Sequence, residues 1–203
     1  MSMKQFVLNL EDMMQFSQLM LRLQDVVRAI HVPGRDIKEN DVEHSYHLAM
    51  MSWYLNMSGE LGYDTDRLVR YALIHDLAEA YAGDVSALDR VGRIGKPERE
   101  AAALSRILRE FPLAEDIIHA VHNYETLADE EAKFVYALDK LMPMVMVYLA
   151  DGRTWREENQ GFNVMHQCQA PKIAVSEPVD QLYAQLQTLL LRRPQLFGAP
   201  TWA

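Results

Sequence analysis

The sequence predicts an all-α fold in a single domain. Apolar residues recur every three or four positions along most of the chain, as they do on one face of a helix. No segment shows the apolar-polar alternation that is typical of a half-buried strand. A chain of 203 residues is long enough for one well-buried core and short for two independent domains. We therefore expect one helical domain over residues 1–203, with its core at about 15–150 and a loop and a helix at 151–203.

Three helices are predicted in the first half of the chain. The apolar residues of segment 16–30 describe one helix face, and Pro33-Gly34 interrupts the pattern. A second helix is predicted over residues 41–58. A third begins after Asp64-Thr65 and ends at Gly83, a residue suited to a helix C-terminus.

The second half of the chain continues the helical pattern. One helix is predicted to begin at residues 126–129, which resemble a capping box, and to continue to Ala150 with a kink or break at Pro143. The remaining expectations are loops at 84–97 and 161–178, helices at 98–110, 114–123 and 179–193, and a loose tail at 194–203.

Composition and charge narrow the class of protein. The net charge of -9 and the pI near 5.2 disfavour a nucleic-acid polymer as partner. Cys168 is the only cysteine, which excludes an internal disulfide framework and a zinc site built from several thiolates. Residues 1–10 are too mixed for a signal peptide, and the apolar segment 141–150 is too short to cross a bilayer. We expect a cytoplasmic protein with no membrane contact.

Four polar residues occupy predicted helices beside apolar neighbours: His44, the adjacent pair His75-Asp76, and Asp139. Histidine and aspartate are uncommon at such positions unless a partner satisfies them. Each one alone is more often a hydrogen-bonded core residue than a metal ligand. Taken together, two imidazoles and two carboxylates offer the mixed nitrogen and oxygen ligation that suits a divalent Mn, Fe, Co, Ni, Zn or Mg ion.

The order and spacing of these residues resemble a known family. The chain contains Glu43-His44-Ser45, then His75-Asp76-Leu-Ala-Glu79 through Gly83-Asp84, and finally Asp139. This pattern resembles the HD superfamily of metal-dependent phosphohydrolases, an all-helical HD-domain fold, and within it the small 5'-deoxynucleotidase group. The resemblance covers about residues 15–150. It implies that His44, His75, Asp76 and Asp139 are the metal ligands.

The resemblance also implies catalytic roles for Glu79 and Asp84. Spacing supports Glu79 independently, because it lies four residues after His75 and three after Asp76, on the same predicted helix face. A carboxylate beside a metal site can orient water or take its proton. Asp84 could donate a proton to the leaving oxygen or position the nucleophile. The division of acid and base roles between them stays open.

Arg28 and Lys140 are the candidate substrate-binding residues. Arg28 corresponds to a phosphate-contacting arginine before the first motif, although Arg22 or Arg35 could take that place. A solvated helix-end cation is an equally good interpretation of Arg28. Lys140 could neutralise the phosphate or pair with Asp76 or Glu79.

A pair of histidines at i, i+3, His119 and His122, could hold a second metal, but a structural role on an amphipathic helix is the better interpretation.

The function that the resemblance implies is release of phosphate from deoxynucleoside 5'-monophosphates, a small-molecule substrate. One alternative is a deoxynucleoside triphosphate triphosphohydrolase, whose extra cations the basic stretch of residues 90–99 could supply, although that stretch is equally typical of an exposed loop. A catalytically silent nucleotide or metal sensor is the third hypothesis. A homodimer is expected, with the apolar segment 141–149 as a candidate contact.

Overall fold

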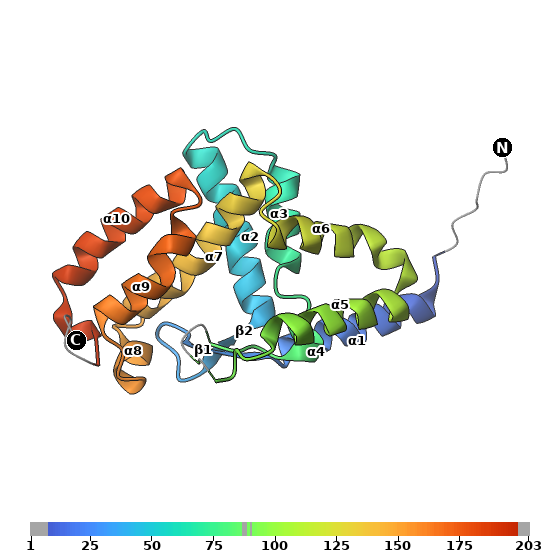
Figure 1. Cartoon of the computed structure of the whole chain (residues 1–203), viewed down its shortest axis with the longest axis horizontal. Coiled ribbons are helices and arrows are strands. Elements are labelled where there is room, and N and C mark those ends of the chain that lie inside the picture. The colour runs from blue at the N-terminus through green and yellow to red at the C-terminus, as the bar shows by residue number, and fades with distance from the viewer. Residues whose placement is uncertain (1–7, 87–88, 90, 199–203) are drawn as a thin grey trace.

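The computed structural model describes residues 8–86, 89 and 91–198. In that part of the chain the fold is helical, which confirms the predicted all-α class, and a small antiparallel sheet pairs β1 with β2. The elements in Figure 1 are α1 (Leu10–Gln24), β1 (Val27–His31), β2 (Lys38–Asn40), α2 (Asp41–Ser58), α3 (Thr65–Ile74), α4 (Glu79–Ala82), α5 (Lys96–Glu110), α6 (Glu115–Glu125), α7 (Glu130–Leu149), α8 (Arg153–Glu157), α9 (Phe162–Ile173) and α10 (Glu177–Leu191), with the short 3-10 turns η1 (Pro112–Ala114) and η2 (Pro194–Leu196).

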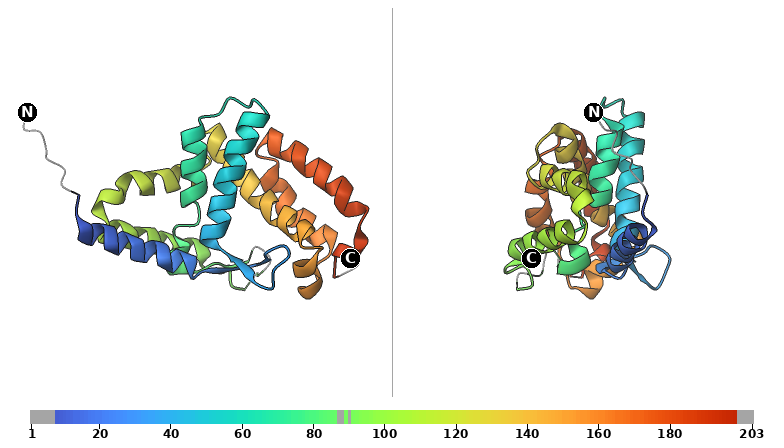
Figure 2. Two further views of the ribbon diagram at one scale, coloured as in Figure 1. Left: turned by 180° about the vertical axis from the view of Figure 1, so that it is seen from behind. Right: turned by 90° about the vertical axis from the view of Figure 1, so that its right-hand side faces the viewer.

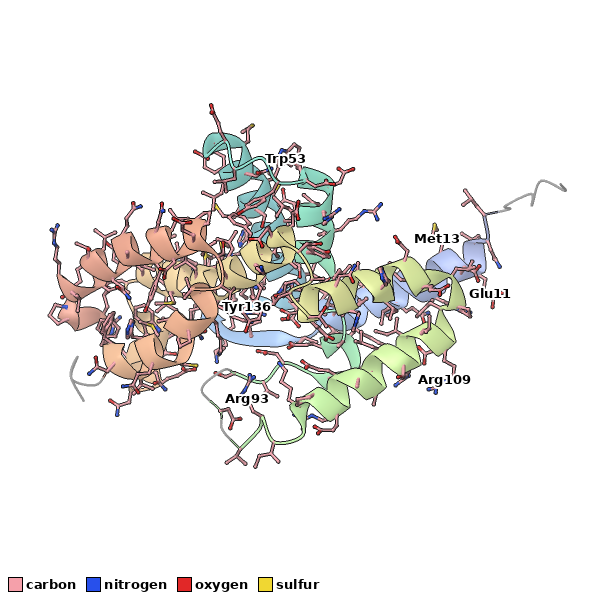
Figure 3. All side chains as sticks on the ribbon, turned by 45° about the horizontal axis from the view of Figure 1, so that its top comes forward. Glu11, Met13, Trp53, Arg93, Arg109 and Tyr136 are labelled. Carbon is pink, nitrogen blue, oxygen red and sulfur yellow. The ribbon has the colours of Figure 1, made fainter. Side chains whose placement is uncertain are left out.

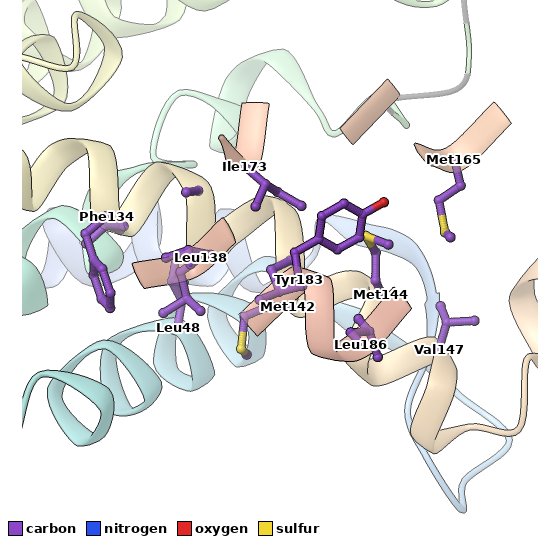
Figure 4. Close-up of a cluster of buried hydrophobic side chains, with 14 of the residues drawn as sticks. Leu48, Phe134, Leu138, Met142, Met144, Val147, Met165, Ile173, Tyr183 and Leu186 are labelled. Atoms are coloured by element: carbon purple, nitrogen blue, oxygen red, sulfur yellow. The ribbon is translucent and has the colours of Figure 1, made fainter. Parts of the chain in front are cut away.

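The helices bury two apolar clusters. The main core joins α2, α3, α7, α9 and α10, and α7 runs through its centre (Figures 1 and 4). The small cluster has Leu19, Leu77 and Ile107 at its centre and joins α1, α4 and α5. Figures 1 and 2 show α1, α5 and α6 at one end of the molecule and α8, α9 and α10 at the other. The main core includes Leu48, Phe134, Leu138, Met142, Met144, Val147, Met165, Ile173, Tyr183 and Leu186.

Side-chain caps fix where the two central helices begin. The Asn40 side chain accepts the Glu43 N–H at 3.0 Å, and the Glu43 carboxylate accepts the Asn40 N–H at 3.2 Å. This capping box starts α2 at Asp41, so His44 occupies its first turn. At α7 the cap is Asp129, which accepts the Ala132 N–H at 2.8 Å. The predicted capping box beginning at residue 126 was therefore wrong by three residues.

The third predicted helix is not continuous to Gly83. After α3, the N–H groups of Leu77 and Glu79 bond to the carbonyls three residues earlier, Ile74 and Asp76, at 3.0 and 2.8 Å. These tight turns interrupt the helix before α4, and Gly83 then adopts a φ of 74° that ends α4. The break places His75 and Asp76 in a turn between two helices.

The first predicted helix ends early. It stops at Gln24, and residues 27–31 form β1, which pairs with β2 through an irregular register between Val27↔Asn40 and His31↔Lys38. The expectation of no strand was therefore wrong here. The cause is pairing with a segment distant in sequence, which helical periodicity in residues 16–30 does not reveal.

Three expectations for the second half also need correction. Residues 161–178 are not a loop, because α9 and the start of α10 occupy them. Pro143 lies within α7 and does not split it. The tail is not loose over 194–198, since Leu196 and Phe197 are buried in the main core, while residues 199–203 lie outside the described part of the chain.

The apolar segment 141–149 belongs mainly to the interior. Leu141, Met142, Met144 and Val147 are buried, and Leu149 is exposed. Most of the side chains predicted to contact a partner subunit therefore pack in the core. Among the described helices, none combines the length and apolar character that crossing a membrane requires.

Candidate metal centre

Three helices and a turn bring the four predicted ligands together. His44 lies in the first turn of α2, His75 and Asp76 follow α3, and Asp139 lies in the middle of α7. His44 Nε2 is 2.9 Å from Asp139 Oδ1, and His75 Nε2 is 3.6 Å from the same oxygen. Ligand atoms of His44, His75 and Asp76 all lie within 4.8 Å of one another. The sequence pattern thus corresponds to one compact cluster.

Both imidazoles are oriented through Nδ1. The His75 Nδ1–H donates to the Ala72 carbonyl at 2.9 Å, which leaves its Nε2 facing Asp76 and Asp139. The His44 Nδ1 lies 3.5 Å from Glu39 Oε2, and its Nε2 faces Asp139. A partner on one ring nitrogen fixes the tautomer and directs the other nitrogen to the centre, as in many metal sites.

The cluster fits a divalent cation. His75 Nε2 is buried and has no hydrogen-bond partner of acceptable geometry, although Asp76 Oδ2 lies 2.9 Å away. A cation bound between His75 Nε2 and the carboxylates that it faces would give this nitrogen a partner. Acidic groups also exceed basic ones around the centre. The carboxylates of Glu39, Asp41, Asp76, Glu79, Asp84 and Asp139 accompany the cations Arg28, Arg93, Lys96 and Lys140.

The pKa values of His75 and Asp76 also indicate that the centre favours a positive charge. Burial on its own would lower the pKa of His75, but the Asp76 and Asp139 carboxylates raise it to about 10. Although burial would raise the pKa of Asp76, His75 and Arg28 hold it below its usual range. Opposite charges thus dominate over desolvation at the centre. A divalent cation would take the place of the proton on His75, because a metal ligand must be deprotonated.

Glu79 reaches the same centre from α4. Its side chain is 4% exposed and accepts a hydrogen bond from Lys96 Nζ at 2.8 Å, and Lys96 also lies 3.2 Å from Glu100. Burial, with added repulsion from Asp76 and Asp84, raises the pKa of Glu79 to about 9. Glu79 therefore lies near the His75-Asp76 pair, as predicted. The turn between α3 and α4 brings it there, and not a shared helix face.

Arg28 lies on β1 and extends into the site. The sequence had predicted that it would lie at the end of a helix. It is 14% exposed, and its Nη1 lies 2.8 Å from Asp76 Oδ2 and 3.2 Å from Asp41 Oδ1. Of the alternatives, Arg22 stacks over the Tyr81 ring at 5.7 Å and Arg35 is exposed in a turn. Arg28 is thus the arginine of the three that lines the central cavity.

Lys140 pairs with the neighbouring Asp139 Oδ2, and not with Asp76 or Glu79 as sequence reasoning had allowed. The Tyr124 hydroxyl lies 3.5 Å from the same oxygen. Asp139 therefore directs Oδ1 to the two histidines and Oδ2 to groups that balance its charge. His119 and His122 are exposed on α6, and the metal-binding groups formed by the described residues do not include them.

One cavity borders this centre at Asp76 and Asp139 and extends beyond it. Its polar end is lined by Arg28, Asp76, Glu79, Asp84, Asp139 and Lys140. Its other end is mainly apolar and is lined by residues of β1, α7, α8 and α9. They are Ile30, Met144, Val147, Trp155 and Met165, together with the polar residues Thr154, Gln169 and, just after α8, Glu158. A small molecule with an anionic group and a flat apolar group would match the two ends.

Sequence reasoning missed several residues of the site. Glu39 and Asp41 are fully buried beside Arg28, yet an acid near a helix start is common and gave no signal. Lys96 was assigned to an exposed basic loop but binds Glu79. In the same stretch, Arg99 donates to the carbonyls of Gly92 and Ile94 and so holds the loop backbone; Arg90 lies outside the described residues.

Comparison with known proteins places the chain in a family. The sequence model of the HD domain matches residues 20–179. The 5'-deoxynucleotidase HDDC2 of zebrafish is 32% identical over 143 residues, which cover 68% of this chain and 70% of that protein. The human 5'-deoxynucleotidase HDDC2 is 33% identical over 132 residues, and the match covers 63% of each chain, so it spans less than two thirds of that relative.

Solved structures agree with the sequence relatives. A predicted metal-dependent phosphohydrolase from Magnetospirillum magnetotacticum superposes with a TM-score of 0.81 at 28% identity, covering 94% of this chain and 96% of the other. A conserved hypothetical protein from Pyrococcus furiosus, at 22% identity and a TM-score of 0.61, shares the fold. The matched helices, the His…His-Asp…Asp cluster and the extent of the sequence match lead to one conclusion: the chain belongs to the HD domain family.

Proposed function

We propose that this protein is a metal-dependent phosphohydrolase that releases phosphate from deoxynucleoside 5'-monophosphates. The observation that carries the proposal is the convergence of His44, His75, Asp76 and Asp139 beside a cavity that Glu79 also lines. A binding site alone does not require a buried carboxyl beside the ligands. The names of the zebrafish and human relatives supply the substrate class.

Each group of residues has a distinct task in this proposal. His44, His75, Asp76 and Asp139 hold a divalent cation, whose identity the ligand set leaves among several metals. Bound there, the cation supplies Lewis-acid chemistry for the phosphate oxygens and makes a nearby water more acidic. The Arg28 guanidinium, which already borders the cavity, binds phosphate oxygens through paired N–H groups.

Glu79 and Asp84 handle the protons of the reaction. Hydrolysis of a phosphate ester requires one proton to leave the attacking water and another to reach the leaving oxygen. Both carboxyls line the cavity, and Glu79 is held by Lys96 at 2.8 Å. In the metal-free protein, burial and the neighbouring carboxylates raise the pKa of Glu79 to about 9, so this carboxyl holds a proton more tightly than one in water.

The triphosphohydrolase hypothesis needs additional free cations in the cavity. Lys96 is bound to Glu79 and Glu100, and Arg99 is bound to backbone carbonyls, so two residues of the basic stretch are already used. Arg93 lines the cavity from the loop before α5 (Figure 3). This distribution of charge favours a monophosphate as substrate.

The test is a product analysis with purified protein. Deoxynucleoside mono- and triphosphates are incubated with the protein and Mn, Co, Zn, Ni, Fe or Mg, and the released phosphate or triphosphate is identified. We expect phosphate from monophosphates, loss of activity in His75→Ala and Asp76→Ala, and full activity in His122→Ala, whose histidine is exposed on α6. Release of triphosphate would identify a triphosphohydrolase. Nucleotide binding with no product under any metal would identify a sensor.

We also propose a homodimer and a cytoplasmic location. The main core takes up segment 141–149, so the contact must lie elsewhere. An exposed apolar face of α2 offers Tyr46, Met50, Trp53 and Tyr54. Figure 3 shows Trp53 on this helix. Light scattering of the purified chain measures its mass directly, and a monomeric mass would reject the dimer.

A further inference from the structure

The apolar end of the cavity has a defined relation to the metal centre, because both lie along α7. Asp139 and Lys140 line the polar end, and Pro143, Met144 and Val147 continue the same helix face. Eight residues of helix separate Asp139 from Val147, a distance of about 12 Å along the axis. A phosphate ester bound at the centre would therefore direct its remaining groups along this face.

The Trp155 ring adds a flat aromatic surface to the lining of the cavity. Trp155 of α8 is 5% exposed, and its ring stacks on Phe197 with centroids 5.0 Å apart and planes at 11°. Met165 of α9 completes the wall, and Figure 4 shows Met144, Val147 and Met165 in the same part of the core. Such a wall suits a planar ring more than a flexible hydrated chain.

Gln169 interrupts this apolar surface. It follows Met165 by one helical turn and precedes Ile173 by another, so it occupies the buried face of α9. Its Oε1 is buried and has no hydrogen-bond partner among the described residues, and the side chain lines the cavity. An amide oxygen buried without a partner has lost its hydrogen bonds to water, and a donor from a ligand would replace them.

We propose that the apolar end of the cavity binds the nucleobase of the substrate and that Gln169 Oε1 accepts one of its N–H groups. This inference rests on the proposed function and adds a specificity residue to it. The preferred substrate is then a phosphate ester whose leaving group bears a flat heterocycle with an N–H donor. A sugar phosphate without a base binds only through the polar end.

The experiment compares substrates with and without a base. Values of kcat/KM are measured for a deoxynucleoside 5'-monophosphate and for deoxyribose 5-phosphate in wild type, Gln169→Met and Gln167→Met. Methionine has a similar shape to glutamine and no amide. Gln167 is exposed on the same helix and provides the matched control. Calorimetric binding of the product deoxynucleoside to metal-free protein gives a second readout that needs no catalysis.

We expect Gln169→Met to lower kcat/KM about tenfold for the nucleotide and to weaken deoxynucleoside binding about tenfold. Hydrolysis of deoxyribose 5-phosphate should stay within about twofold, and Gln167→Met should match wild type. An equal fall for both substrates, or no change for either, would overturn the assignment of Gln169. If wild type hydrolyses no nucleotide, the proposed function fails, and deoxynucleoside binding to wild type and Gln169→Met still decides whether the pocket exists.

Discussion

The main core and the small cluster contribute different groups to the site. His44 and Asp139 lie on α2 and α7, which bury Leu48 and Leu138 in the main core. Glu79 and Lys96 lie on α4 and α5, and these helices join the small cluster centred on Leu19, Leu77 and Ile107. The His75-Asp76 turn connects the two. Two of the proposed ligands, His44 and Asp139, thus come from the larger cluster, and the Glu79–Lys96 pair comes from the smaller one.

We therefore expect the proposed cation site and Glu79 to differ in local stability. A segment with fewer buried apolar contacts opens at lower free energy than a well-packed core. The α4 helix is four residues long and gains its support from neighbours in the small cluster. We therefore expect the ligand cluster to persist under conditions in which Glu79 loses its position.

The largest expected effect on stability is in the main core. Phe134→Ala removes a fully buried ring that lies 5.3 Å from the Tyr63 ring, and it should lower the free energy of unfolding by about 3–5 kcal/mol. Urea denaturation measures the change. Leu149→Ala, at an exposed position of the same helix, should stay within about 0.5 kcal/mol of wild type. Equal losses in the two variants would contradict the assigned core.

A smaller, local effect is expected in the small cluster. Ile107→Ala should cost about 2–4 kcal/mol, since the side chain is fully buried. Hydrogen exchange should increase in α4 and α5 while α7 stays protected, and the exposed Leu108→Ala provides the control. If exchange rises equally in α7, the two clusters unfold as one unit and the distinction between them disappears.

The next effect concerns the orientation of His44. Glu39 is 2% exposed, and its Oε2 lies 3.5 Å from His44 Nδ1 and 3.6 Å from Arg28 Nε. Glu39→Gln keeps the shape and removes the charge, and it should weaken binding of a divalent cation about 10- to 100-fold. Calorimetric titration of metal-free protein measures this affinity. Glu60→Gln, at an exposed position, should leave it unchanged; the same weakening there would reject a specific role for Glu39.

The effect that is smallest per pH unit is a pH dependence of the metal-free protein. The pKa of Glu79 is raised to about 9, so the folded state holds this proton more tightly than the unfolded chain does. From about pH 5 to 9 the unfolding free energy therefore falls as pH rises, by at most about 1.4 kcal/mol per pH unit from this group. Glu79→Gln should flatten that slope in urea denaturation series, and the exposed Glu98→Gln should not. An unchanged slope in Glu79→Gln would show that the carboxyl is ionised in the folded protein.

The sequence could predict the helices whose caps or apolar stripes lie within the helix itself. The α2 helix follows from its cap and α5 from a strong apolar stripe, and both were expected within a few residues. The relative placement of His44, His75 and Asp139 came from a family pattern, since nothing local shows that these residues meet. The structure brings them within contact of one another.

The parts that sequence missed depend on contacts between distant segments. Residues 27–31 become a strand only because residues 38–40 pair with them, which moved Arg28 from a helix end into the site. The α9 helix was taken for a loop, and its sequence has no strong apolar stripe and contains Pro171. Its contacts with α7 and α10 are what the local pattern does not show.

The chain segment after α10 supports one wall of the cavity, which matters when the protein is shortened for study. Phe197 supports the Trp155 ring, and Gly152 and Gly198 leave no room for a Cβ because the backbones of η2 and α8 touch there. A protein truncated after Arg193 would keep every proposed metal ligand and lose the support of one wall of the cavity. The C-terminal residues therefore support the cavity wall at Trp155 while contributing no proposed metal ligand.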